Sequence, residues 1–220
     1  MSDRTEFNLT WLVESPVGIG DFPAYDGLCS NIRGAITYGY PITTLPNNLK
    51  KIEEGNLLYY WYGTKDNILL GSELHVRDQG LVVSITGKKP ELAKNPPYAS
   101  DLYLAILQDT NRAIRLLSDE QLSNDGFKLW KRLYDGGACV AVYDNKEKTA
   151  GQSFKLLPTL KDFNQYFSEH DSSYARYQYV IMKKGSSAMA ETMSYFGLRR
   201  LRETAGLDLE DFAPTWNRIL

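Results

Sequence analysis

The sequence is poor in the residues on which metal centres and disulfide frameworks depend. Only two cysteines, Cys29 and Cys139, and two histidines, His75 and His170, occur in 220 residues. No C-x-x-C pair is present, so a Cys/His zinc site would need ligands from four distant points, unlike the close ligand spacing of known sites. We therefore expect no metal site, and free thiols of the kind usual in the cytoplasm.

Long apolar runs and an excess of basic residues are also missing. The first residues, MSDRTEFNLTWLVESP, lack the apolar core of a signal peptide. No run approaches the roughly 20 apolar residues of a membrane span. The formal net charge is −2, which argues against nucleic-acid binding through overall charge but leaves a local basic patch open. These absences predict a cytoplasmic protein with no membrane contact.

Tyrosine is the residue that stands out among those present. The chain has 15 Tyr against 8 Phe and 4 Trp, a composition that suits a sheet with one wet face and also suits binding surfaces. We find no repeat or linker, which predicts one domain over residues 1–220. Residues 185–220 are expected to form a C-terminal helical extension of that domain.

Alternating apolar and polar residues between turn signals predict strands. An antiparallel meander of three strands is expected at Leu57–Tyr62, Ile68–Val76 and Leu81–Thr86. Further strands are expected at Phe7–Ser15, Arg112–Leu117, Ala138–Asp144 and Tyr174–Lys184.

Helical spacing of apolar residues beside capping residues predicts helices between these strands. Residues 16–34, rich in Gly and Pro, are instead expected to form an irregular loop. Expected helices are Pro46–Gly55, Tyr98–Thr110, a helix around Phe127–Tyr134 and one capped by Thr159. The order of elements predicts an α+β fold, with a mixed, mostly antiparallel twisted sheet flanked by helices.

Two stretches resemble the GCN5-related N-acetyltransferase (GNAT) family. One is the meander with its following loop and helix, Leu57–Leu107; the other is LWKRLYDGGACVAVYD, in which Leu133 and Tyr134 precede a glycine and a strand. The resemblance implies a GNAT-like fold that takes acetyl-CoA or another acyl-CoA as donor. It implies an amine acceptor, on a small molecule or a protein. It also implies that the strands near Leu81–Thr86 and Arg112–Leu117 run parallel and splay apart to receive the donor.

The resemblance places the donor's pyrophosphate on the loop and helix start after the meander, where helix amides and lysines attract phosphate. The loop, GKKPELAKNPPYAS, lacks the family's Gln/Arg-x-x-Gly-x-Gly/Ala pattern. Pro96 and Pro97 remove two amide donors from it. The candidate residues are Lys88, Lys89, Lys94, Tyr98, Ala99 and Ser100.

The resemblance also implies a general acid at Tyr134. A phenol, with an ordinary pKa near 10, is suited to protonate a leaving thiolate. Glu73 and His75 are candidates for the base that takes the amine's proton, because they alternate with Leu74 and share one face of a strand. The alternative stays open that Tyr134 is a packing aromatic and that both base candidates are solvated strand residues.

Two other classes of function remain open. The same scaffold would serve as a non-catalytic module that binds a protein through its aromatic strands or its C-terminal helix. Arg199, Arg200 and Arg202, near Tyr195 and Phe196, would form a basic and aromatic patch for nucleic acid.

Overall fold

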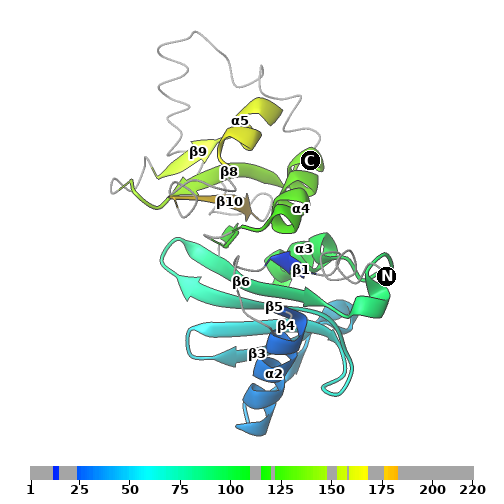
Figure 1. The fold of residues 1–220 in the computed structure, drawn as a ribbon. Helices are drawn as coiled ribbons and strands as arrows, with labels where there is room; N and C mark the ends of the chain where they lie inside the picture. Colours follow the sequence, from blue (N-terminus) through cyan, green and yellow to red (C-terminus); the bar gives the residue numbers. More distant parts are fainter. Residues whose placement is uncertain are drawn as a thin grey trace.

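The computed structural model describes residues 12–14, 24–109, 115–119, 122–147, 153–157, 159–167 and 176–182. In this part of the chain, ten strands form one mixed, mostly antiparallel sheet flanked by four α-helices (Figure 1). The predicted α+β class is therefore confirmed. The predicted C-terminal extension and the arginine cluster lie outside the described residues. No described helix is long and apolar enough to cross a membrane.

The strands lie in the order β2-β3-β4-β5-β6-β7-β10-β8-β9, and β1 pairs with β6 beside this row. Their bounds are β1 (Leu12–Glu14), β2 (Thr43–Thr44), β3 (Lys50–Glu54), β4 (Leu57–Gly63), β5 (Ile68–Arg77), β6 (Gly80–Lys88), β7 (Arg115–Leu117), β8 (Cys139–Asp144), β9 (Phe154–Leu156) and β10 (Tyr177–Met182). The helices are α2 (Ala24–Thr37), α3 (Ala99–Asp109), α4 (Asn124–Asp135) and α5 (Leu160–Gln165), with 3₁₀ turns at Pro46–Asn48 and Pro90–Leu92.

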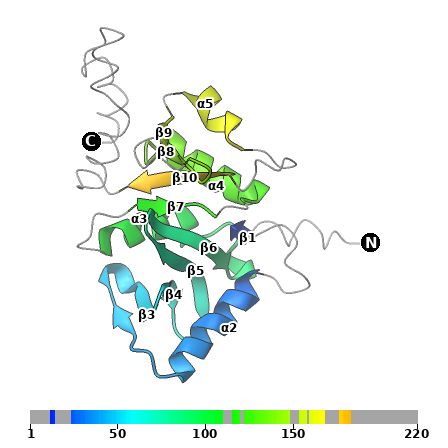
Figure 2. The ribbon, with the colours of Figure 1, turned by 90° about the vertical axis from the view of Figure 1, so that its left-hand side faces the viewer.

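The predicted meander is confirmed as β4, β5 and β6, which pair antiparallel in sequence order. The strands predicted at Ala138–Asp144 and Tyr174–Lys184 are confirmed as β8 and β10, and the end of Arg112–Leu117 as β7. Figure 2 shows β10 between β7 and β8, antiparallel to both. The strand predicted at Phe7–Ser15 is described only at Leu12–Glu14, and these residues form β1.

The helix predicted at Pro46–Gly55 is wrong. The segment begins with a single 3₁₀ turn, Pro46–Asn48. This turn does not continue as a helix because Asn47 and Asn48 adopt positive φ values of 60° and 59°. The following residues form β3, which pairs along its length with β4 and buries Ile52 completely. Pairing with an adjacent strand outweighs the weak helical preference of this short polar stretch.

The irregular loop predicted over residues 16–34 is also wrong in its described part, where α2 begins at Ala24. Leu28, Ile32 and Ala35 follow helical spacing and are buried against the sheet. Gly27 and Gly34, which suggested a loop, lie where an added Cβ would meet open space. Tertiary packing of the apolar face therefore outweighs the cost of two glycines.

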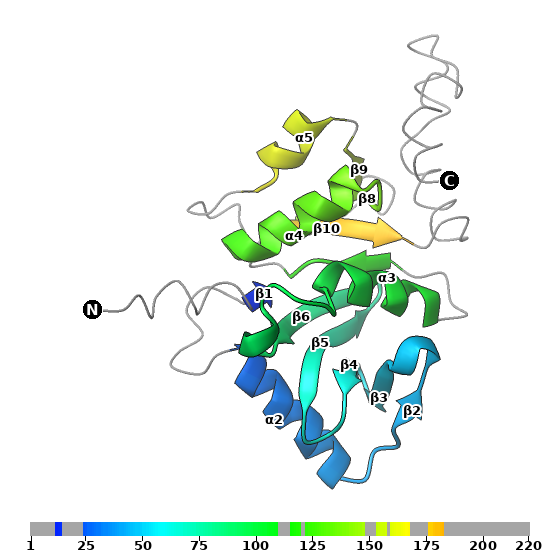
Figure 3. The ribbon, with the colours of Figure 1, turned by 90° about the vertical axis from the view of Figure 1, so that its right-hand side faces the viewer.

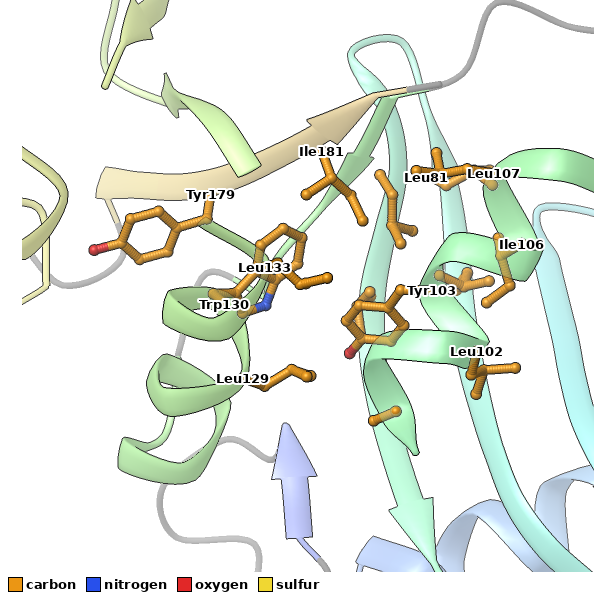
Figure 4. Packing of buried hydrophobic residues seen from close by; sticks show 14 of the residues in the cluster. Leu81, Leu102, Tyr103, Ile106, Leu107, Leu129, Trp130, Leu133, Tyr179 and Ile181 are labelled. Atoms are coloured by element: carbon orange, nitrogen blue, oxygen red, sulfur yellow. The ribbon is translucent and has the colours of Figure 1, made fainter. Parts of the chain in front are cut away.

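Helices cover both faces of the sheet. α3 and α4 lie side by side over one face, as Figure 3 shows, and their apolar residues join those of β4, β5, β6 and β10 in the largest core cluster. Figure 4 shows Leu102 and Tyr103 of α3 and Trp130 and Leu133 of α4 converging there. α2 covers the opposite face of the meander, over Ile52 and neighbouring strand residues.

Capping residues mark both ends of α4. Ser123 is the N-cap, and its side chain accepts a hydrogen bond of 3.1 Å from the Gly126 N–H. After the helix, Gly137 takes the left-handed conformation, with φ of 78°. The cap predicted at Thr159 is confirmed, since its hydroxyl accepts from the Asp162 N–H at the start of α5.

Candidate functional site

The only parallel pair among the described strands joins β6 to β7, and it is short. Leu81 lies opposite Leu116 and Val82 opposite Leu117, and the ladder then stops. On its other side β6 pairs with β5 along its whole length. We call the main chain of residues 83–87, on the side of β6 that faces β7, the β6 edge.

A bulge lies in the first part of the β6 edge. The consecutive β5 residues Glu73 and Leu74 lie opposite Ile85 and Val83, so Ser84 is the extra residue on β6. Within the described chain, no strand pairs with this bulged part of the β6 edge. Bulges interrupt pairing and re-aim side chains, and they are common beside functional sites.

The end of the β6 edge is covered by β1. Glu14 lies opposite Thr86 and Leu12 opposite Gly87, in antiparallel pairing. β1 also contacts α4 (Figure 4), so it lies between that helix and β6. On this side of β6, the pairing with β7 therefore stops just before the β6 edge. β1 pairs with the other end of that edge.

A buried carboxylate lies one strand away, on the face covered by α2. Glu73 is only 6% exposed, and one of its oxygens accepts a hydrogen bond of 2.8 Å from the Asn31 amide. Its other oxygen lies 3.8 Å from His75 Nε2. Burial, followed by the charge of Glu73, raises the pKa of Tyr59, which lies opposite Glu73 on β4. The structure therefore brings the two predicted base residues together.

On the face covered by α3, a buried chain of hydroxyls ends at the β6 edge. Ser72 donates to the Ile85 carbonyl at 3.1 Å, so it accepts from Thr86 at 2.9 Å. Thr86 in turn accepts from Tyr103, also at 2.9 Å. All three hydroxyl-bearing residues are fully buried. The chain fixes α3 to β5 and β6 beside the part of the edge that β1 covers.

Of the predicted pyrophosphate residues, Lys88 and Tyr98 lie together. Lys88 is 4% exposed, donates to the Asn95 carbonyl and lies 4.9 Å from the centre of the Tyr98 ring. Burial lowers the pKa of Lys88, against an opposing effect of Asp101. Asp101 lies in the first turn of α3, where its charge already interacts favourably with the helix dipole.

The start of α3 leaves few amides for an anion. The Tyr98 carbonyl accepts the N–H groups of Asp101 and Leu102 at 3.1 Å. Ala99 and Ser100 come before these residues, so their N–H groups have no intrahelical acceptor. Ala99 is buried and Ser100 half-buried. These two amides are the donors that the helix itself leaves available.

The other two lysines lie at the surface. Lys89 donates to the Asn67 side chain at 3.0 Å, and Lys94 is exposed, with its carbonyl 3.4 Å from the Tyr98 hydroxyl. Both side chains are in solvent-accessible positions from which they can swing toward a phosphate bound near the start of α3.

Tyr134 lies apart from the predicted base residues. It is half-buried near the end of α4, with its ring 5.0 Å from that of Phe163 in α5, and it packs against the core cluster that contains Leu74. Because neighbouring strand residues point to opposite faces, Glu73 faces away from this cluster. The predicted acid and base therefore lie on opposite faces of the sheet.

Sequence reasoning missed Asn31, Thr86 and Tyr103 as contributors to this region. Asn31 lies on α2, in the segment expected to be a loop, and the spacing of its apolar neighbours was the signal that would have revealed the helix. Within the described chain, no three His, Cys, Asp or Glu side chains gather in a metal-binding group. Cys29 is buried, and burial raises the pKa of its thiol.

Comparison with known proteins found no match to any family model, curated protein or solved structure.

Proposed function

We propose that this protein is a GNAT-like acyltransferase that transfers an acyl group from acyl-CoA to an amine on a small-molecule or protein acceptor. The observation that supports it is the parallel pair of β6 with β7, the only one among the described strands, whose ladder ends at Val82 and Leu117 in the middle of the sheet. The helix after β6 and the helix after β7 pack on one face. The family resemblance implies that these two strands also splay apart beyond this ladder to form the donor site.

The residues around the β6 edge fit an acyl-CoA donor in an altered manner. The pantetheine arm carries secondary amides, which can pair with the main-chain groups at the bulge around Ser84, where no described strand pairs on the side facing β7. Lys88, Lys89 and the amides of Ala99 and Ser100, which have no acceptor within α3, would attract the phosphates. The negative charge of Asp101 in the first turn of α3 would repel a phosphate bound there. The two lysines at the surface, Lys89 and Lys94, would supply most of the positive charge that offsets this repulsion.

Glu73 is the residue best placed to act as general base. Its carboxylate is buried, oriented by Asn31 and adjacent to His75. Bound acyl-CoA supplies an activated acyl carbon, to which the acceptor nitrogen bonds as the carbon–sulfur bond breaks. Glu73 would take the proton that the nitrogen loses, with His75 as its exit toward solvent. Tyr134 lies on the other face of the sheet, so the proton that the thiolate gains would come from water.

Acetyl-CoA is expected to stabilise the protein against heat. A ligand at 100 times its Kd adds about 2.7 kcal/mol to the stability of the folded state, which is a shift of several degrees for a chain of this size. The measurement is thermal unfolding at millimolar acetyl-CoA, with pantetheine, which carries no phosphate, and ATP as separate controls. An unchanged midpoint with acetyl-CoA would contradict the donor assignment.

Substitution of the proposed base is expected to slow turnover without weakening donor binding. Glu73→Gln keeps the shape and the hydrogen-bonding capacity of the side chain but removes its basicity, and we expect about 100-fold slower acyl transfer. Tyr134→Phe keeps the ring packed on Phe163, and because Tyr134 lies on the face opposite Glu73, we expect this variant to keep the wild-type rate. The matched surface control is Glu53→Gln. Unchanged turnover in Glu73→Gln, with the acetyl-CoA shift intact, would refute the role of Glu73 as base. A roughly tenfold loss in Tyr134→Phe would show instead that its hydroxyl protonates the thiolate.

A second candidate is a protein-binding module on the same scaffold. Exposed apolar side chains cluster between α2 and β2, where Tyr38 is 83% exposed and Ile42 is 45% exposed. Such residues mark contact surfaces when they gather in one place. A protein that co-purifies with the wild type and is lost from a Tyr38→Ser/Ile42→Ser variant, together with no response to acetyl-CoA, would favour this function.

A further inference from the structure

We propose that β1 is a replaceable strand that closes the β6 edge, so that the chain's own residues 12–14 compete with the acyl-CoA donor. The proposal rests on the proposed function and adds a form of autoinhibition to it. It follows from where β1 lies: its partners Thr86 and Gly87 continue the same edge on which the pairing with β7 ends at Val82.

The β6 edge exists without β1. Its backbone is held from the other side by β5 along the whole strand and by the buried hydroxyl chain through Thr86. At Gly87 an added Cβ would lie 2.7 Å from Tyr25 Cα, so the start of α2 packs directly on the strand. These contacts fix the main chain of β6 whether or not β1 is paired with it.

Among the described strands, β1 pairs with β6 alone, over a short ladder. It is three residues long, and its pairing with β6 is irregular between Leu12 and Glu14. Each main-chain hydrogen bond contributes only about 1 kcal/mol net, so a short ladder is a weak restraint. A ligand that binds the same groups can therefore displace it at ordinary affinity.

The edge is also suited to an extended ligand with amide groups. Buried main-chain N–H and C=O groups need partners, and addition of a strand or a strand-like ligand to an exposed edge supplies them. β1 is one such occupant, at Thr86 and Gly87. A pantetheine arm that runs from phosphates near Lys88 to the bulge at Ser84 would pass over the same two residues. Both would lie between β6 and α4, which β1 already contacts, so they cannot bind together.

The test is a double variant of the full chain, Leu12→Pro/Glu14→Pro, which removes two N–H donors from β1. The matched control is Asp3→Pro/Glu6→Pro. If β1 closes the edge about nine-tenths of the time, its loss should lower the Kd for acetyl-CoA about tenfold, as measured by calorimetry. Equal affinity in the variant and the wild type would overturn the proposal. If the double variant does not fold, a variant in which residues 1–16 are deleted takes its place.

A second arm separates failure of this proposal from failure of the proposed function. A fluorescent peptide with the sequence FNLTWLVESP should bind the double variant more tightly than the wild type, and acetyl-CoA should release it. If acetyl-CoA binds none of the proteins, the donor and the competition both fall, and peptide binding alone shows whether the edge accepts a strand. If acetyl-CoA binds but does not release the peptide, the competition is refuted while the proposed function stands.

Discussion

Replacement of Trp130 by alanine is expected to lower the free energy of unfolding by about 4 kcal/mol, within the usual range for a buried tryptophan. Trp130 is fully buried. Its ring lies 5.7 Å from that of Tyr103 in α3 and 6.4 Å from that of Tyr179 in β10 (Figure 4). Alanine would remove these contacts and leave a cavity that three separate elements cannot close.

The loss should be global, because Trp130 connects the two halves of the fold. Tyr103 belongs to the helix that packs on the meander, and Tyr179 belongs to the strand between β7 and β8. Denaturant unfolding measures the loss. Trp130→Phe, which keeps an aromatic ring, should cost less than half as much, and Lys128→Ala, on the exposed side of α4, should cost under about 0.5 kcal/mol. A loss below about 1.5 kcal/mol for Trp130→Ala would show that the site collapses around the gap.

The elements predicted well are those whose signal is local. The meander carries alternating residues on each strand and turn residues between them, so β4, β5 and β6 are specified without knowledge of distant contacts. α4 likewise has its apolar spacing and its glycine stop in one stretch. The segments predicted wrongly, Pro46–Gly55 and the described part of residues 16–34, are those where packing against distant strands decides between weak local preferences.

The candidate site was predictable to the same extent. Alternation along one strand places Glu73 beside His75, and the sequence predicts that pair. Asn31 meets Glu73 across 42 residues of chain, and no local pattern encodes such a contact. Nor does any pattern indicate that residues 12–14 cover the end of β6, since their pairing is also long-range. The opposite faces of Glu73 and Tyr134 follow from the side on which α4 packs, which the sequence alone leaves undetermined.

Replacement of Asp144 by asparagine is expected to cost about 2 to 3 kcal/mol of stability. Asp144 is fully buried at the end of β8. It accepts two hydrogen bonds of 2.8 Å from the Arg176 guanidinium and one of 2.7 Å from Lys155 Nζ. The variant keeps the size of the side chain but leaves two cations without their counter-charge. Because both cations are about one-third exposed, water compensates in part, and the cost stays at the lower end for a buried ion pair.

Asp135→Asn is the matched control for this substitution. Asp135 forms an ion pair of 2.7 Å with Lys131 on the surface of α4, and its own side chain is 53% exposed. Surface pairs of this kind contribute about 0.3 to 0.5 kcal/mol. Thermal and denaturant unfolding of both variants should therefore differ clearly. Equal losses would mean that the Asp144 network contributes no more than an exposed pair.

The same network predicts how stability depends on pH. Hydrogen bonds from Arg176, opposed by burial and reinforced by Lys155, hold the pKa of Asp144 well below its usual range. A carboxyl group with a lowered pKa in the folded state stabilises the protein above its unfolded pKa of about 4, and this stabilisation is lost as the pH falls further. Unfolding free energies measured between pH 6 and about pH 3 should therefore fall more steeply for the wild type than for Asp144→Asn, so that the difference between the two curves narrows toward the acid end. Parallel curves over this range would show that another carboxyl group, and not Asp144, governs the acid sensitivity of the fold.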